Sequence, residues 1–170
     1  IKTLYPIPED PYDFMMDGHI VGKYWPLLKV LQKSVLDILE HFHGHRPQIV
    51  PDELWIKGGF GGDGFSGCTD RIGKDIDINT TNRYFVALKI ARIIVKNKNG
   101  QSYSYAKEYF VETSQSFVTM RAFVIAEFKE NHDTITKTWK WVEREWEMVK
   151  TFTVQFYGCE IKIHFENPKL

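Results

Sequence analysis

The chain has few of the features that mark secreted, membrane-spanning or strongly charged proteins. Its 170 residues include only two cysteines, Cys68 and Cys159, and neither belongs to a CxxC pair, so we expect two reduced thiols. No apolar run is long enough to cross a bilayer, and the first residues lack the apolar stretch of a signal peptide. We therefore expect a nuclear or cytoplasmic protein with no membrane association. The chain also lacks a starting Met, which indicates a fragment or a processed product.

An excess of charge of either sign is also missing. Lys and Arg number 22, Asp and Glu number 22, and the formal net charge is zero. This balance excludes a protein coated in basic charge, but it allows local patches. What the chain does have is 43% apolar and 15% aromatic residues, enough for the core of one folded domain.

Hydrophobic periodicity predicts two helices. Apolar residues from Leu27 to Phe42 recur at helical spacing, and Pro26 suits a first helical position, so the first helix is predicted over 26–43. The second begins at Asp133 as N-cap and carries one apolar stripe. That stripe comprises Ile135, Trp139, Val142, Trp146 and Val149. We expect Trp139, Val142 and Trp146 to be buried against a sheet.

The strands predicted from β-branched and aromatic runs surround the second helix. They are 54–56, 84–95, 103–112, 117–128 and 152–165, the last interrupted by Gly158, with a hairpin turn at Asn99-Gly100. Residues before about Lys23 hold three prolines and read as an irregular arm. Several antiparallel strands followed by a helix and one more strand predict an α+β fold with the helix packed on one sheet face.

A glycine-rich segment, residues 58–64, follows the short apolar strand 54–56. It matches neither a phosphate-binding loop nor a dinucleotide fingerprint. Asp63 stands among glycines just past a buried strand, where a carboxylate is held rigidly and is open to a bulky phosphate, as magnesium sites for phosphoryl transfer require. The alternative is a glycine-rich loop with a solvated Asp.

Basic residues are concentrated in one hairpin. Between Ile78 and Lys107 there is no Asp or Glu. The basic residues there that are candidates for phosphate contacts are Arg83, Lys89, Arg92, Lys96 and Lys98. The alternative is that these lysines protect a sheet edge.

Two further sets of polar residues are weaker candidates. His41, His43 and His45 lie at the end of the first predicted helix, where a solvated helix end is the better interpretation than a metal site. Glu143, Glu145 and Glu147 lie among basic residues of the second helix, which indicates a solvated helix face.

One segment resembles a known family. It consists of Trp55-Ile56-Lys57, the glycines that follow, and Asp63-Gly64. It resembles the first strand and the catalytic Asp-Gly turn of the RAG-type V(D)J recombinase catalytic subunit and its Transib-like transposase relatives. The order downstream is similar, including Ser114-Gln115-Ser116 before an apolar strand and the helix start at 130–135. The resemblance covers about residues 35–165. A strict alignment from Lys57 places the family's Asp at Gly61 rather than Asp63, so both positions stay open.

This resemblance implies a ribonuclease-H-like mixed sheet with antiparallel strands, one packed amphipathic helix and an N-terminal helix. Residues 1–46 would form the arm and helix, and 47–170 the N-terminal part of an incomplete domain. The family cuts and joins DNA with three acidic residues and Mg²⁺ or Mn²⁺. Asp63 would be the first catalytic and metal-binding residue, and the other two acids would lie beyond Leu170.

The predicted function is therefore the DNA-binding part of a transposase- or recombinase-type nucleotidyltransferase, inactive alone, with a homodimer as a further expectation for the complete protein. Two alternatives stay open. One is a domesticated, non-catalytic nucleic-acid-binding domain, and the other is a protein-interaction α+β domain.

Overall fold

A computed structural model of the chain describes residues 10–43, 52–66, 82–99, 102–110 and 120–166. These residues form one eight-stranded sheet and two helices. The strands are β1 (Tyr12–Met16), β2 (His19–Tyr24), β3 (Glu53–Ser66), β4 (Asn82–Asn99), β5 (Ser102–Phe110), β6 (Met120–Glu127), β7 (Thr151–Phe156) and β8 (Cys159–Phe165). The helices are α1 (Leu27–His43) and α2 (His132–Met148).

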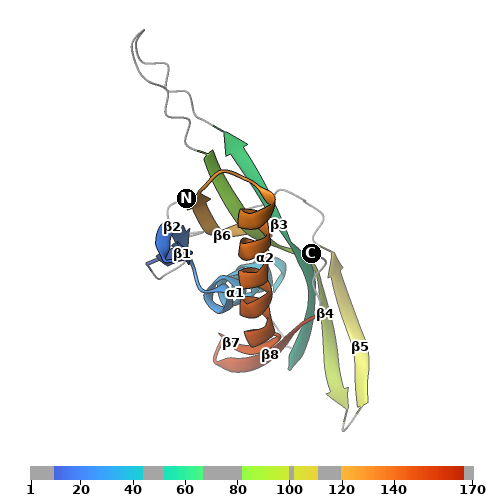
Figure 1. The fold of residues 1–170 in the computed structure, drawn as a ribbon. Helices are drawn as coiled ribbons and strands as arrows, with labels where there is room; N and C mark the ends of the chain where they lie inside the picture. The colour runs from blue at the N-terminus through green and yellow to red at the C-terminus, as the bar shows by residue number, and fades with distance from the viewer. Residues whose placement is uncertain (1–9, 44–51, 67–81, 100–101, 111–119, 167–170) are drawn as a thin grey trace, which may run out of the picture.

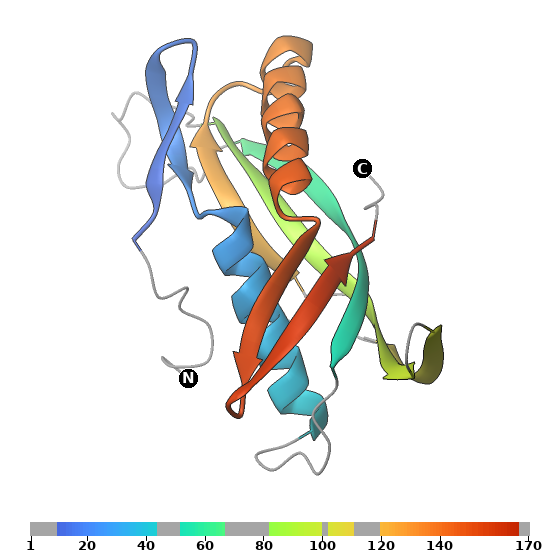
Figure 2. The same ribbon diagram turned by 90° about the horizontal axis from the view of Figure 1, so that it is seen from below.

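The strand order in the sheet is β1-β2-β6-β4-β3-β8-β7, with β5 pairing with β4 beyond the end of β6. All neighbours are antiparallel except β3 and β8, which run parallel. The long strands β3 and β4 form the spine of the sheet, which curls so that β7 and β8 face β6 across α1 (Figures 1 and 2). The described residues thus form a curled mixed sheet with both helices on its concave side.

The predicted ribonuclease-H-like fold is therefore wrong. The described chain is mostly sheet and curls into a half-barrel, whereas the prediction was a ribonuclease-H-like mixed sheet with one packed amphipathic helix and an N-terminal helix. Bulges account for much of the curling, because an extra residue in one strand bends and twists the pair. Register shifts occur at Phe14/Met15, Lys57/Gly58, Val86/Ala87 and Val95/Lys96.

The first strands were predicted as an irregular arm, and this prediction is wrong. Residues 12–24 form a hairpin whose turn is Asp17-Gly18, with φ of 51° and 80°. Two successive residues with positive φ are typical of the type I′ turn that matches the twist of a hairpin, and Asp-Gly is among its preferred sequences. β2 then pairs with β6 and joins the hairpin to the main sheet.

The last predicted strand is two strands. β7 and β8 form a second tight hairpin whose turn, Tyr157-Gly158, also has positive φ at both positions. Apolar residues alternate along both strands, with Phe152, Val154 and Phe156 buried and the residues between them exposed. The interruption at Gly158 was thus a turn signal, since glycine adopts positive φ without steric cost.

Helix α1 confirms the predicted amphipathic helix. Its apolar face is fully enclosed, with Leu27, Leu31 and Val35 all at 0% exposure. On its other side Asp37 accepts a hydrogen bond from Arg121 of β6, and Lys33 also pairs with Asp37. Both Asp37 and Arg121 are nearly buried, so this ion pair is part of the packing between α1 and the sheet.

Helix α2 starts at an N-cap that differs from the prediction. Asn131, not Asp133, is the cap, because its side chain accepts a hydrogen bond from the Thr134 backbone while the Thr134 hydroxyl bonds the Asn131 backbone. This reciprocal arrangement resembles a capping box. Asp133 lies in the first turn instead.

The buried face of α2 is rotated from the predicted stripe. Val142 is fully buried as predicted, whereas Trp139 and Trp146 are only partly buried. Thr138 is fully buried, and its hydroxyl donates to the Thr134 carbonyl. Trp141 is also partly buried, and it packs against aromatic rings of the first hairpin and of β6. The first hairpin, which supplies Phe14 and Tyr24 to this contact, was not predicted as a hairpin, so the packing of Trp141 was not predicted either.

Candidate nucleic-acid-binding face

The two faces of the β3–β4 pair differ in what covers them. Along β4, Tyr84, Val86, Leu88 and Ile90 are buried under the helices. The alternate residues point to the opposite, convex side, because successive side chains of a strand point to opposite faces. We call this side the outward face of β3 and β4. Its described members are Lys57, Gly59, Gly61, Asp63, Arg83, Phe85, Ala87, Lys89, Ala91 and Arg92.

The outward face contains a shallow hollow of about 490 Å³. Four glycines, together with Phe60 and Asp63, form the β3 side of the hollow, while Phe85, Ala87, Lys89 and Ala91 form the β4 side. A Cβ built at Gly61 meets no atom within 4 Å, so space above this strand is open. The glycine segment was predicted to leave the strand as a loop, but β3 runs through it in register with β4 as far as Ser66.

Three of the five predicted basic residues have described side chains on this face. Lys89 lies opposite Gly59, at the hollow, and Arg92 lies opposite Lys57. Ala91 is the extra residue of the bulge, so Ala91 and Arg92 are both exposed between buried Ile90 and Ile93. Arg83 lies farther along β4.

Carboxylates neutralise the basic residues at the margins of this face. The Arg83 guanidinium lies 3.7 Å from Glu127 of β6, and the Lys57 ammonium lies 3.3 Å from Glu166, just after β8. No carboxylate of the described residues forms an ion pair with Lys89. Among the described residues, Lys89 therefore brings a positive charge to the hollow, which Asp63 also lines.

Lys96 lies where β4 pairs with both β3 and β5, and Lys98 lies where β4 pairs with β5 alone. Their backbone is described, but their side chains lie outside the described atoms. Other predicted features also lie outside the described part of the chain. They are the turn at residues 100–101, residues 69–81 of the predicted loop, His45, and the side chains of His41 and His43.

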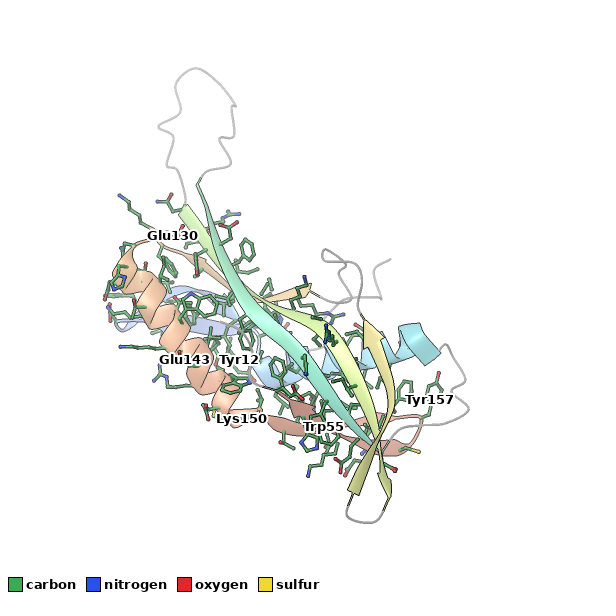
Figure 3. All side chains as sticks on the ribbon, turned by 90° about the vertical axis from the view of Figure 1, so that its right-hand side faces the viewer. Tyr12, Trp55, Glu130, Glu143, Lys150 and Tyr157 are labelled. Carbon is green, nitrogen blue, oxygen red and sulfur yellow. The ribbon has the colours of Figure 1, made fainter. Side chains whose placement is uncertain are left out.

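Asp63 is exposed on the outward face, opposite Phe85. The strand 54–56 is interior, between β4 and β8, as predicted. In a ribonuclease-H-like sheet a catalytic Asp63 would also lie beside the strand that starts near Phe152, and this expectation is wrong. β7 and β8 reach β3 only at Glu53–Ile56, the opposite end of the strand. Figure 3 shows these two ends, with Trp55 at one and Glu130 at the other.

The concave side of the same strand end holds a tyrosine, a tryptophan and a glutamate. Burial raises the pKa of the Tyr84 hydroxyl; a hydrogen bond with Trp139 opposes this, and the charges of Glu130 and Asp63 add to it. A Cβ at Gly62 would lie 2.3 Å from the Tyr84 hydroxyl, so glycine is required for Tyr84 to cross β3 here. Glu130 similarly lies against Gly64.

The described residues do not fit the metal site that the family resemblance implies. They contain no group of three or more His, Cys, Asp or Glu side chains placed to hold a metal ion. Hard divalent cations need several oxygen ligands. Glu130 is the other carboxylate that raises the pKa of Tyr84. It lies against Gly64 on the concave side, whereas Asp63 is on the outward face, so the two do not form a metal site together. We therefore derive no catalytic step through a metal.

One acidic residue predicted as solvated has a structural role. Glu143 and Glu147 are exposed, but Glu145 is half-buried and accepts a hydrogen bond from the backbone N–H of Leu27, the first residue of α1. Burial raises the pKa of Glu145, while this hydrogen bond and Arg144 lower it. Nothing in the local sequence of α2 indicated this contact, because its partner is at the other end of the chain.

A second unpredicted cluster lies where β3 meets β8. The Trp55 and His164 rings stack with centroids 4.2 Å apart, and His164 Nε2 lies 3.0 Å from Glu53 Oε2. Glu53 is 8% exposed. The parallel register that pairs Trp55 with His164 brings these residues together, and a sequence alone does not reveal such a pairing.

No known family model matches the chain, and no curated protein matches it. None of the helices in the described residues is both long enough and apolar enough to cross a membrane.

Proposed function

We propose that the chain is a nucleic-acid-binding module of a transposase- or recombinase-type protein, and that it binds the DNA backbone on the outward face of β3 and β4. The observation that carries the proposal is the placement of Lys89 at a glycine-rich hollow, with Arg92 exposed farther along the same face of β4. Glycines let another backbone approach closely, and Lys and Arg contacts to phosphates supply most of the sequence-independent affinity for DNA. The resemblance of residues 55–64 to the recombinase family supports DNA as the ligand.

The non-catalytic form of this proposal fits the structure better than the catalytic form. Asp63 lies at the end of β3 away from β7 and β8, and the described residues do not complete a metal site around it. On the outward face, Asp63 instead limits where a phosphate can lie, because like charges repel. The phosphates would therefore lie toward Lys89 and Arg92.

The test is a titration of a labelled 20-base-pair duplex followed by fluorescence anisotropy at several salt concentrations. The variant Lys89→Glu/Arg92→Glu should bind more weakly to every sequence. Its slope of log affinity against log salt should be smaller by about 2, since roughly 0.9 is lost for each phosphate contact.

The matched control is Lys140→Glu/Arg144→Glu. Both residues are exposed on α2, so this variant has the same net charge change away from the outward face. The control should keep the affinity and the salt slope of the parent. Equal losses in both variants would mean that only net charge matters and would contradict the proposed face.

A second candidate is a protein-docking face on the first hairpin and β6. Ile20 is 62% exposed and Met15, its partner across the hairpin, is 50% exposed. Ile125 of β6 is also exposed, on the same convex side. Exposed apolar patches often mark protein interaction sites. If DNA binds only the outward face of β3 and β4, the variant Ile20→Lys/Ile125→Lys should bind DNA at least as tightly as the parent.

A further inference from the structure

The edge of β3 that faces away from β4 is only partly paired. β8 pairs with Glu53–Ile56, and the last link is the Glu166 N–H donating to the Ile56 carbonyl at 3.0 Å. From Lys57 to Ser66, β3 continues as a regular strand alongside β4. Among the described residues no strand pairs with this second edge, which we call the open edge of β3.

The backbone groups that point to the open edge can be identified from the alternation of the strand. The Ile56 carbonyl points toward β8, and its side chain is buried on the concave side. The bulge near Gly58 places its extra residue, Ala91, in β4, so β3 keeps its alternation. Successive residues of a strand direct their N–H and C=O groups to opposite edges. The groups on the open edge therefore belong to Gly58, Phe60, Gly62 and Gly64.

Between Gly58 and Ser66 the open edge has few of the features that normally protect a strand edge. Natural edges are short, or carry proline, lysine or bulges that block another strand. Residues 57–66 contain no proline, and their charged residues are Lys57 at the start and Asp63. Three of the four residues that present backbone groups to the edge are glycines, which add no side chain to obstruct an incoming strand.

We propose that the open edge of β3 binds an extended polypeptide strand from a protein partner, which extends the line of β8 along Lys57–Ser66. A row of alternating backbone donors and acceptors is satisfied by another extended polypeptide backbone, and edge addition is an established mode of peptide recognition. This inference concerns a different part of β3 from the proposed DNA contacts, which lie on the outward face.

The surroundings define the side chains of the partner strand. On the concave side, the Phe60 ring lies 6.0 Å from the Phe165 ring, and Trp139 lies near Gly62. On the convex side, the nearby residues are Lys57 and Asp63. The partner strand should therefore carry apolar residues at every second position, facing Phe60 and Trp139, with polar residues between them.

Amide hydrogen exchange tests the edge itself. In the free chain the amides of Phe60, Gly62 and Gly64 should exchange quickly, whereas those of Gly61 and Asp63, which bond to β4, should be protected. Uniform protection of all these amides in the free chain would show that the edge is already occupied and would overturn the proposal.

A peptide titration tests binding. The probe is a fluorescein-labelled ten-residue peptide of alternating valine and threonine with a lysine at each end. It should bind saturably and slow exchange at Phe60, Gly62 and Gly64. The same peptide N-methylated at every second residue should not bind, because it lacks donors along one edge. Equal binding of both peptides, or binding of neither, would overturn the proposal.

Two variants complete the test. Gly64→Pro removes one open-edge N–H, and the only side chain that its Cβ contacts closely is that of Glu130, which can move. It should weaken peptide binding about tenfold, which corresponds to one lost hydrogen bond. Gly61→Ala, at an open position whose N–H faces β4, is the control and should bind like the parent.

Other outcomes identify other ligands. A dimer of the parent chain that dissociates in Gly64→Pro would assign the edge to a second copy and overturn the choice of a separate partner. Lys89→Glu/Arg92→Glu should keep its peptide affinity, so a failure of DNA binding and a failure of strand binding can be told apart.

Discussion

The Trp141 ring of α2 packs edge-on against the Phe14 ring of β1, with centroids 5.1 Å apart and planes at 74°. Tyr24 of β2 and Phe123 of β6 contact the same indole ring. This aromatic cluster joins the first hairpin, the centre of the sheet and α2. It explains why residues 12–24, predicted as part of an irregular arm, are an integral part of the fold.

Trp141→Ala should destabilise the domain by about 3 kcal/mol, because it removes a large ring from a packed aromatic cluster. Trp146→Ala, at the far end of α2 and outside this aromatic cluster, is the comparison and should cost less. Denaturant unfolding of both variants measures the difference. If Trp146→Ala were the more damaging change, the rotation of α2 described above would be wrong.

Asp37→Ala should be severely destabilising, by about 3–5 kcal/mol, because it leaves the buried Arg121 guanidinium without the carboxylate that neutralises it. Replacing both residues with apolar ones, as in Asp37→Leu/Arg121→Met, should recover most of the loss. Thermal unfolding of the single and double variants tests this. A double variant no better than Asp37→Ala would show that the ion pair is not the cause.

Glu145 should make the stability depend on pH. Its folded pKa is raised, so its contribution is fully present below the unfolded value, near 4.5, and is lost as the pH rises through the folded value. Glu145→Gln keeps an acceptor for the Leu27 N–H without the charge, so it should be at least as stable as the parent at pH 7 and no different below about pH 4. Glu145→Ala, which lacks the acceptor, should be less stable than the parent below about pH 4, and this difference should become smaller as the pH rises.

The Tyr84 hydroxyl should ionise above the usual range of tyrosine, since burial and two carboxylates disfavour the phenolate. Glu130→Gln should lower the pKa of Tyr84, and Asp63→Asn should lower it less, in keeping with the order of their contributions. NMR titration of ring-labelled tyrosine, assigned with Tyr84→Phe, measures this. An unchanged pKa in Glu130→Gln would contradict the placement of Glu130 beside Gly64.

Asp63→Asn should leave the unfolding free energy nearly unchanged, because the side chain is exposed. The same substitution should strengthen DNA binding a few-fold if phosphates lie on the outward face, since it removes a like charge. Anisotropy titration with the parent as reference gives both the sign and the size. Weaker binding by Asp63→Asn would indicate that the carboxylate holds a bridging cation instead.

Local patterns predicted the elements that depend on local information. The apolar spacing of 27–42 predicted α1, and the β-branched run of 84–95 predicted β4, because side-chain periodicity survives in most tertiary surroundings. Lys89 and Arg92 were correctly placed on the strand predicted over 84–95, and β4 also includes Arg83, one residue before that predicted strand. The sequence did not predict that these residues share one sheet face with the glycines, because that arrangement depends on the pairing of β3 with β4.

The predictions that failed depended on distant contacts. Glycines disfavour a strand, so 58–64 read as a loop, yet pairing with β4 outweighs that preference. The Asp17-Gly18 turn was a readable hairpin signal that the neighbouring prolines obscured. The curl of the sheet results from several bulges, which leave little trace in sequence.

The hydrogen bond between Glu145 and the Leu27 N–H has a consequence for synthesis of the protein. α1 emerges early from the ribosome, but α2, which supplies the acceptor for its first turn, emerges late. β7, which packs against α1, follows α2. The apolar side of α1 therefore stays partly exposed until the residues up to β7 have been made, and during that time the helix is a substrate for chaperones.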